Sequence, residues 1–185
     1  MKELVALAKA RPGAINHSSA GVGTFTFLAA EMFKRQAAVN MLHVPYRAGG
    51  EALTAVISGE TSVYFSPAAG ALPQVKQGRL RPLAVTSSKR ITLMPELPTV
   101  AESGVPGYEV TAWYGVSAPA KTPPAVVERL NSEMLRALKL PDVREQLKSQ
   151  GADPVGSTPA QYSAFMQNEI SKWAKVIAAA GIKGE

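Results

Sequence analysis

Apolar and polar residues alternate in short blocks along the first half of the chain, and the blocks predict helices and strands in turn. Apolar residues recur at helical spacing in 2–10, 24–36, 50–58 and 68–77. Compact runs that favour strands lie between them, at 14–18, 40–44, 62–65 and 83–86. Strands that alternate with helices of about ten residues are typical of parallel βαβ units, so the pattern predicts an α/β fold.

The pattern changes after residue 86. Residues 87–107 are polar and rich in Pro and Gly, with a short helix expected at 99–103, and 110–118 reads as a strand. Helical patterns then follow at 125–138, 141–150 and 160–180, with another short strand expected at Val155. Each of the three helical segments has a proline at or just before its first residue, and the last two are followed by a glycine, as is usual at helix starts and ends.

Composition is that of a globular protein. The 185 residues are 46% hydrophobic and 18% charged, which suffices for one domain or two small ones. No apolar run approaches the roughly 20 residues of a membrane span. Charged residues interrupt 1–10 at helical spacing, so this segment is expected to be an amphipathic helix and no signal peptide. The chain has no cysteine, which excludes disulfides and thiolate metal sites.

The net charge of +6 raises the question of a nucleic-acid partner. The 20 Lys and Arg residues are spread along the chain, and aromatic residues make up only 6% of it. Basic and aromatic residues do not interleave as they do in a base-stacking surface. We therefore expect no nucleic-acid binding, and note that a positive field attracts small carboxylates.

The turn between the first predicted strand and the helix at 24–36 is the main candidate for a binding site. Its residues are small, so they leave the backbone open: Ser18, Ser19, Ala20, Gly21, Val22, Gly23 and Thr24. Thr24 suits a helix cap, and the start of a helix carries free N–H groups with a partial positive charge. Such a turn suits a carboxylate or a phosphate. An ordinary strand-to-helix turn is the alternative interpretation.

Catalysis and metal binding fit the sequence less well. Ser18 or Ser19 with His17 or His43 would make a nucleophile and its base, but the Gly-x-Ser-x-Gly elbow is absent. His17 and Ser18 are adjacent on a predicted strand, so they point to opposite faces. Two histidines and scattered carboxylates lack the spacing of a metal site. We predict no catalytic residue, no metal and no cofactor, and keep an acyl-transfer enzyme as the least favoured alternative.

Four motifs, in this order, resemble those of the Bug (Bordetella uptake gene) receptors of tripartite tricarboxylate transporters. They are Ser18 to Thr24, Val44 to Leu53, Ala71 to Thr86 and Leu97 to Tyr108. The resemblance implies a fold like that of type II periplasmic binding proteins, with a parallel-rich sheet and flanking helices. It also implies a periplasmic receptor that binds a small carboxylate, either a di- or tricarboxylate or an aromatic acid. Such a receptor catalyses nothing and passes its ligand to the membrane components of the transporter.

The resemblance also implies which parts of a receptor are present. Residues 1–109 match its second domain, and 110–185 match the segment that returns to the first domain. The signal peptide and the beginning of the first domain are expected to be missing. A truncated module that binds no ligand, or that self-associates to cover exposed surfaces, is therefore the alternative to a working receptor.

By the same resemblance, three loops face the ligand cleft. The turn at 18–24 is the first, and the others add Tyr46, Arg47 and Ser66 as candidate ligand-binding residues. Arg47 would attract a carboxylate, although a solvated surface arginine explains it equally well. Ser66 lies where many relatives carry an aspartate, so a ligand with an amino group is disfavoured here.

Overall fold

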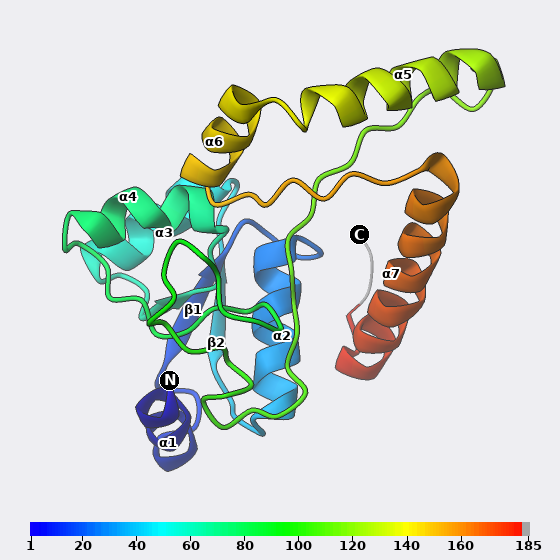
Figure 1. The fold of residues 1–185 in the computed structure, drawn as a ribbon. Coiled ribbons are helices and arrows are strands. Elements are labelled where there is room, and N and C mark those ends of the chain that lie inside the picture. Colours follow the sequence, from blue (N-terminus) through cyan, green and yellow to red (C-terminus); the bar gives the residue numbers. More distant parts are fainter. Residues whose placement is uncertain (183–185) are drawn as a thin grey trace. The chain divides into compact units, whose positions relative to one another are not determined.

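The computed structural model describes residues 1–182, which divide into two compact units (Figure 1). The first unit, Met1–Ala112, contains the sheet. Its elements are α1 (Lys2–Ala10), β1 (Asn16–Ser19), α2 (Phe25–Gln36), β2 (Leu42–Pro45), α3 (Gly49–Ser58), β3 (Val63–Tyr64) and α4 (Ala68–Lys76). The second unit begins at Trp113, and its elements are α5 (Pro124–Ala137), α6 (Pro141–Ser149) and α7 (Pro159–Ala180).

The sheet has three parallel strands in the order β2-β1-β3. In its register, His17 of β1 pairs with His43 of β2 and with Val63 of β3. This arrangement confirms the α/β fold with parallel βαβ units. Because the strands are parallel, the loops that follow them all leave from the same edge of the sheet.

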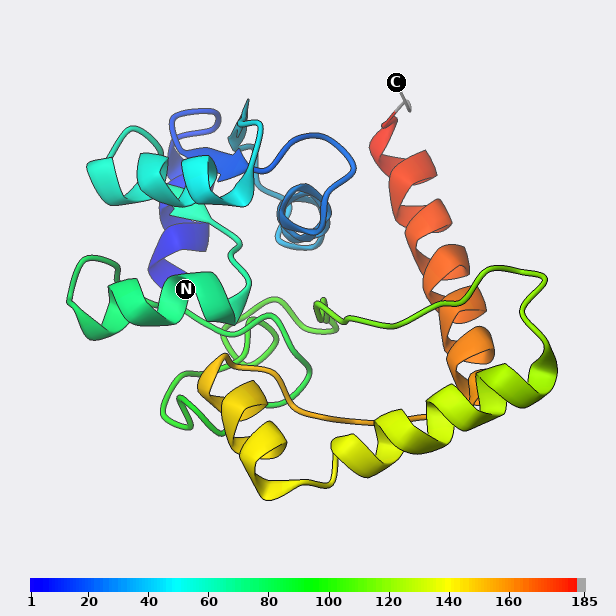
Figure 2. The ribbon, with the colours of Figure 1, turned by 90° about the horizontal axis from the view of Figure 1, so that it is seen from above.

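Helices cover both faces of the sheet, with α2 on one side and α3 on the other (Figures 1 and 2). Alternation along β1 sends neighbouring side chains to different helices. The Ser18 hydroxyl donates to the Ala52 carbonyl of α3 at 3.0 Å. His17 points to the α2 side, where Glu31 lies. The prediction that His17 and Ser18 face opposite ways is therefore confirmed.

The core of the first unit forms where α2 meets the segment 97–110. The rings of Phe65 and Tyr108 pack against Phe33 with centroids 5.4 and 6.3 Å away. The Tyr108 hydroxyl donates to the Ala29 carbonyl at 3.0 Å and is buried. The apolar residues of α2 suggest that Phe27, Leu28 and Met32 face inward. Phe27 and Leu28 are indeed buried, but Met32 is only half-buried and Phe33 takes the inner position.

The predicted helix ends are confirmed at several positions. The Thr24 side chain accepts a hydrogen bond from the Phe27 N–H and caps α2. Thr158 forms a capping box with Gln161 at the start of α7. Gly59, after α3, and Gly181, after α7, adopt the left-handed conformation that glycine allows at a helix end.

Several predicted elements are absent from the part of the chain that the structure describes. Residues 110–118 and Val155 form no strand, and in place of the helix expected at 99–103 the chain forms turns at 100–103. The segment 83–86 makes a single bridge, between Val85 and Thr99. A strand needs a neighbour to complete its hydrogen bonds. After Val110, whose N–H donates to Thr86, the chain runs extended without one.

The second unit is built from helices with little interior. Trp113 packs edge-on against Phe165 of α7 at 5.1 Å, and Asn131 of α5 donates to the Ser157 carbonyl at 2.8 Å. From Trp113 to Ile182 no residue is buried, so this unit has no core of its own. Across residues 1–182, none of the helices combines the length and the apolar character needed to cross a bilayer.

Candidate functional site

The loops that follow the three strands meet at one edge of the sheet. The Tyr46 N–H, just after β2, donates to the Ser19 carbonyl at the end of β1 at 2.9 Å. The Tyr64 hydroxyl of β3 donates to the Gly49 carbonyl at the start of α3 at 3.3 Å. The structure therefore brings the predicted turn at 18–24 and the loop after β2 side by side.

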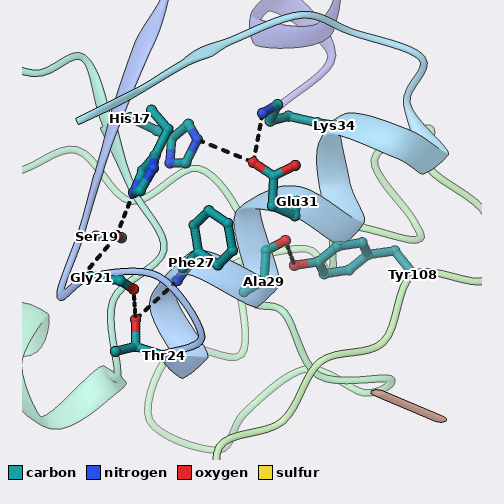
Figure 3. Close-up of polar contacts among 10 residues, drawn as sticks. His17, Ser19, Gly21, Thr24, Phe27, Ala29, Glu31, Lys34 and Tyr108 are labelled. Carbon is teal, nitrogen blue, oxygen red and sulfur yellow. Dashed lines mark hydrogen bonds and ion pairs between the residues drawn. The ribbon is translucent and has the colours of Figure 1, made fainter. Parts of the chain in front are cut away.

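Hydrogen bonds between backbone groups and side-chain hydroxyls fold the β1–α2 loop, residues 20–24 (Figure 3). The Gly21 N–H donates to Ser19 Oγ at 3.1 Å, and the Ala20 N–H donates to Thr26 Oγ1 at 2.9 Å. The Thr24 hydroxyl donates to the Gly21 carbonyl at 2.7 Å. These bonds hold the loop in a tight turn immediately before α2. Thr26, which the sequence analysis did not single out, is part of this support.

Glycine is required at two points of the loop. Gly21 has φ of +106°, and a Cβ there would lie 3.7 Å from the Tyr46 carbonyl oxygen. Gly23 has φ of +78° and open space where a Cβ would be. Both values lie in the left-handed region that other residues rarely adopt. Both glycines therefore serve the backbone conformation of the turn, and neither position is closed to a side chain by its neighbours.

Four N–H groups at the start of α2 lack an acceptor within residues 1–182. They belong to Val22, Gly23, Phe25 and Thr26. Val22 and Gly23 are exposed. Free N–H groups at a helix start carry the positive end of the helix dipole. Free N–H groups of this kind are what an anion site built from backbone requires, and the sequence analysis expected such a site at this turn.

The two serines before the loop are buried, and their hydroxyls are already engaged. Ser18 is bonded to α3, and Ser19 Oγ lies 2.7 Å from His43 Nε2. The Ser19–His43 pair is the one that the acyl-transfer alternative would require. Both serine side chains are fully buried, however, so Ser19 is closed to a substrate.

His43 belongs to a polar cluster between the sheet and α2, together with His17, Glu31 and Lys34. Figure 3 shows the latter three residues. Its ring stacks on His17 with centroids 5.1 Å apart, and the Phe27 ring lies 4.7 Å away. Glu31 Oε1 is 4.0 Å from His17 Nε2, which is too long for a hydrogen bond, and 2.6 Å from Lys34 Nζ. With neutral histidines, the Glu31–Lys34 ion pair leaves the cluster without net charge.

Burial keeps both histidines neutral at pH 7. It lowers the pKa of His17 to about 4, with His43 and Lys34 as further causes. Burial also lowers the pKa of His43, which Glu31 partly opposes. Neither ring nitrogen of His17 has a hydrogen-bond partner among the described residues. The register of β1 against β2 brings the two histidines together, and this pairing is not visible from sequence spacing alone.

The remaining candidates lie on the other two loops. The Tyr46 hydroxyl donates to Glu60 Oε1 at 2.8 Å, and burial together with Glu60 raises its pKa. Arg47 is exposed, and its backbone N–H donates to Glu51 Oε2 at 3.2 Å. The Ser66 hydroxyl donates to the Pro67 carbonyl at 3.0 Å. Of the three side chains, that of Arg47 offers an exposed positive charge near the β1–α2 loop.

Comparison with known proteins places this geometry among receptors. Residues 1–182 match the family described as tripartite tricarboxylate transporter family receptor. BugT of Bordetella pertussis is 36% identical over 182 residues, which are 97% of this chain and 55% of BugT. A protein encoded in the tcbD-tcbE intergenic region of Pseudomonas sp. (strain P51) is 38% identical over 176 residues, 95% of this chain and 52% of that protein. The chain thus spans about half the length of the curated relatives that it matches.

A solved structure of R. palustris Rpa4515 with adipate has a TM-score of 0.90 to this chain and 33% identity, over 97% of this chain and 60% of that one. MatC from Rhodopseudomonas palustris with bound malate has a TM-score of 0.83 and 30% identity, over 96% and 61%. These matches confirm the predicted fold type, and the relatives are solute-binding receptors and not enzymes. The chain belongs to the tripartite tricarboxylate transporter receptor family, the family of the Bug proteins.

Proposed function

We propose that this chain forms the ligand-binding part of a periplasmic receptor for a small carboxylate, which it passes to the membrane components of a tripartite transporter. The observation that carries the proposal is the β1–α2 loop. Its free N–H groups and left-handed glycines make a backbone anion site at the edge of a parallel sheet. Membership of the receptor family supports the same function.

In this proposal the ligand carboxylate lies against the N–H groups of Val22, Gly23, Phe25 and Thr26. Arg47, on the neighbouring loop, adds a positive charge that attracts the anion. Di- and tricarboxylates are the favoured ligands, with aromatic acids as a second class. Adipate in Rpa4515 and malate in MatC, both bound to relatives of this chain, support the first class.

The two halves of the chain have different roles in the proposal. Residues 1–109 supply the second receptor domain with its three loops, and residues 110–185 return to the first domain. The chain spans about half the length of the curated relatives that it matches. The described loops reach a ligand from one edge of the sheet, so for residues 1–185 by themselves we expect an affinity for dicarboxylates on the order of millimolar.

Isothermal titration calorimetry with adipate and malate tests the proposal. Adipamide, which has the length of adipate without its charges, is the matched control ligand. The expected result is heat from the dicarboxylates and none from adipamide. Equal responses to adipate and adipamide would refute a carboxylate site, and so would the absence of binding across a panel of di-, tri- and aromatic carboxylates.

Self-association is the second candidate role, and the second unit favours it. Between Trp113 and Ile182 that unit has no buried residue, and Trp113, Tyr114 and Val116 are 40, 84 and 71% exposed. Apolar surface of this kind favours contact with another protein surface. Light scattering at micromolar concentration should then show a dimer or a larger assembly. A monomer whose amides after Gly107 are well protected from hydrogen exchange would exclude this role.

A further inference from the structure

One oxygen atom connects the histidine cluster to the β1–α2 loop. Ser19 Oγ lies 2.7 Å from His43 Nε2 and 3.1 Å from the Gly21 backbone nitrogen. A backbone N–H can only donate, so Ser19 Oγ accepts from Gly21. The Ser19 hydrogen is then free to donate to His43, provided that Nε2 carries no proton. A neutral His43 with its proton on Nδ1 therefore accepts the Ser19 hydrogen and fixes the direction of the hydroxyl.

The surroundings of His43 favour this neutral form. The ring is half-buried between His17 of β1 and Phe27 of α2. The titratable and charged groups that face it are His17 from β1, and Glu31 and Lys34 from α2. Glu31 favours an imidazolium at this position, and Lys34, which pairs with Glu31 at 2.6 Å, opposes it. Burial correspondingly lowers the pKa of His43.

We propose that His43 is a positioning residue for the carboxylate site, which acts through Ser19 to hold the β1–α2 loop and makes ligand affinity fall in acid. This inference rests on the proposed function, because it concerns the same loop. His43 touches no ligand in it. Its role is to keep Ser19 Oγ turned toward Gly21, so that the neighbouring N–H groups of Val22 and Gly23 stay directed outward.

Protonation of His43 would break this arrangement. The Nε2 atom becomes a donor, and the two lone pairs of Ser19 Oγ can accept from both His43 and Gly21. The Ser19 hydrogen, however, loses its acceptor, and because the side chain is fully buried no water replaces it. A rotation or shift of the hydroxyl toward another acceptor then weakens its bond to Gly21. The new positive charge lies beside Glu31, which offsets its attraction for a bound carboxylate.

Amide hydrogen exchange without ligand tests the link between His43 and the loop. The His43→Leu variant removes the acceptor, Ser19→Ala removes the oxygen, and His43→Gln keeps an acceptor near the position of Nε2. The Gly21 amide should exchange about tenfold faster in the first two variants and near the wild-type rate in His43→Gln. The Tyr46 amide, which donates to the Ser19 carbonyl, reports whether β1 and β2 remain paired.

An unchanged Gly21 rate in Ser19→Ala or His43→Leu overturns the inference. If His43→Leu also accelerates the Tyr46 amide, the sheet itself has loosened, and Ser19→Ala then decides the question. These outcomes do not depend on any ligand, so they leave the proposed function standing.

Calorimetry with adipate tests the effect on binding, from about pH 8 to about pH 5.5. At pH 8, His43→Leu should bind about tenfold more weakly than wild type, and His43→Gln should stay within about twofold. Toward acid, the wild-type affinity should fall by about threefold more than that of His43→Gln, since protonation of adipate itself affects both equally. Equal pH profiles overturn the inference alone. A wild type that binds no carboxylate overturns the proposed function, and the inference with it.

Discussion

Replacement of His17 by leucine should remove a large part of the acid sensitivity of this fold. His17 is fully buried, and its pKa is lowered from 6.5 to about 4, chiefly by burial. Below pH 6.5 the unfolded chain therefore binds a proton that the folded chain refuses. The contribution of neutral His17 to the free energy of unfolding is therefore fully present above pH 6.5. It is lost as the pH falls from 6.5 toward 4.

The difference of about 2.5 pKa units corresponds to roughly 3 kcal/mol. Linkage places about 2 kcal/mol of this loss between pH 7.5 and pH 5, and the rest by about pH 4. The His17→Leu variant has no titrating group at this position, so it does not suffer this pH-dependent loss of stability. At pH 7.5 the variant should be at least as stable as wild type, because the two buried ring nitrogens that lack hydrogen-bond partners are gone.

Urea denaturation of both proteins between pH 7.5 and pH 5 measures the effect. Thr61→Val is the matched control, because Thr61 Oγ1 is also buried without a partner but does not titrate. That variant should gain about 1 kcal/mol at every pH and keep the wild-type slope. If wild type and His17→Leu lose the same free energy of unfolding as the pH falls, the pKa of His17 is the same in the folded and unfolded chains. The claim that His17 causes the acid sensitivity is then refuted.

Three further substitutions test the loop and the core. Gly23→Val should weaken adipate binding at least tenfold, about 1.4 kcal/mol, because valine rarely adopts a φ of +78°. Wild-type affinity in calorimetry would show that the ligand binds elsewhere. Thr24→Ala should lower the free energy of unfolding by about 1 kcal/mol, because the helix α2 loses its cap, whereas Thr24→Ser should change it little. Equal losses in urea denaturation for the two variants would exclude the cap as the cause. Tyr108→Phe should cost about 1 kcal/mol, since it removes a buried hydrogen bond that the Ala29 carbonyl accepts in addition to its helical bond from the Phe33 N–H. Unchanged thermal unfolding would contradict this.

The sequence predicts best those elements whose signals are local. Proline at the start of α5 and α6, the Thr158 cap and Gly181 locate helices to within a residue or two, because each residue acts on its own turn. The inner face of α2 is less certain. Met32 and Phe33 are neighbours that differ by about 100° around the helix, and only packing against Tyr108 selects Phe33.

The predicted strands fail where the partner is distant or missing. Residues 110–118 have a strand-like composition, but no neighbouring strand completes their hydrogen bonds in the described chain. The candidate site shows the same limit. The turn at 18–24 is recognisable from its small residues, whereas the support from His43 depends on strand register and on a contact 24 residues away. The sequence raised this pair only as a nucleophile and its base.

The loop separates the groups that shape it from those on its surface, and this affects how binding preference can change in evolution. The bonds that fold the loop come from backbone and from buried hydroxyls such as Ser19 and Thr26. The side chains of Val22 and Arg47 are exposed and take no part in that folding. If the proposed carboxylate site lies on this loop, substitutions at these two positions change the surface that a ligand meets while the backbone cradle persists. The proposal then implies that single substitutions shift ligand preference and leave the fold intact.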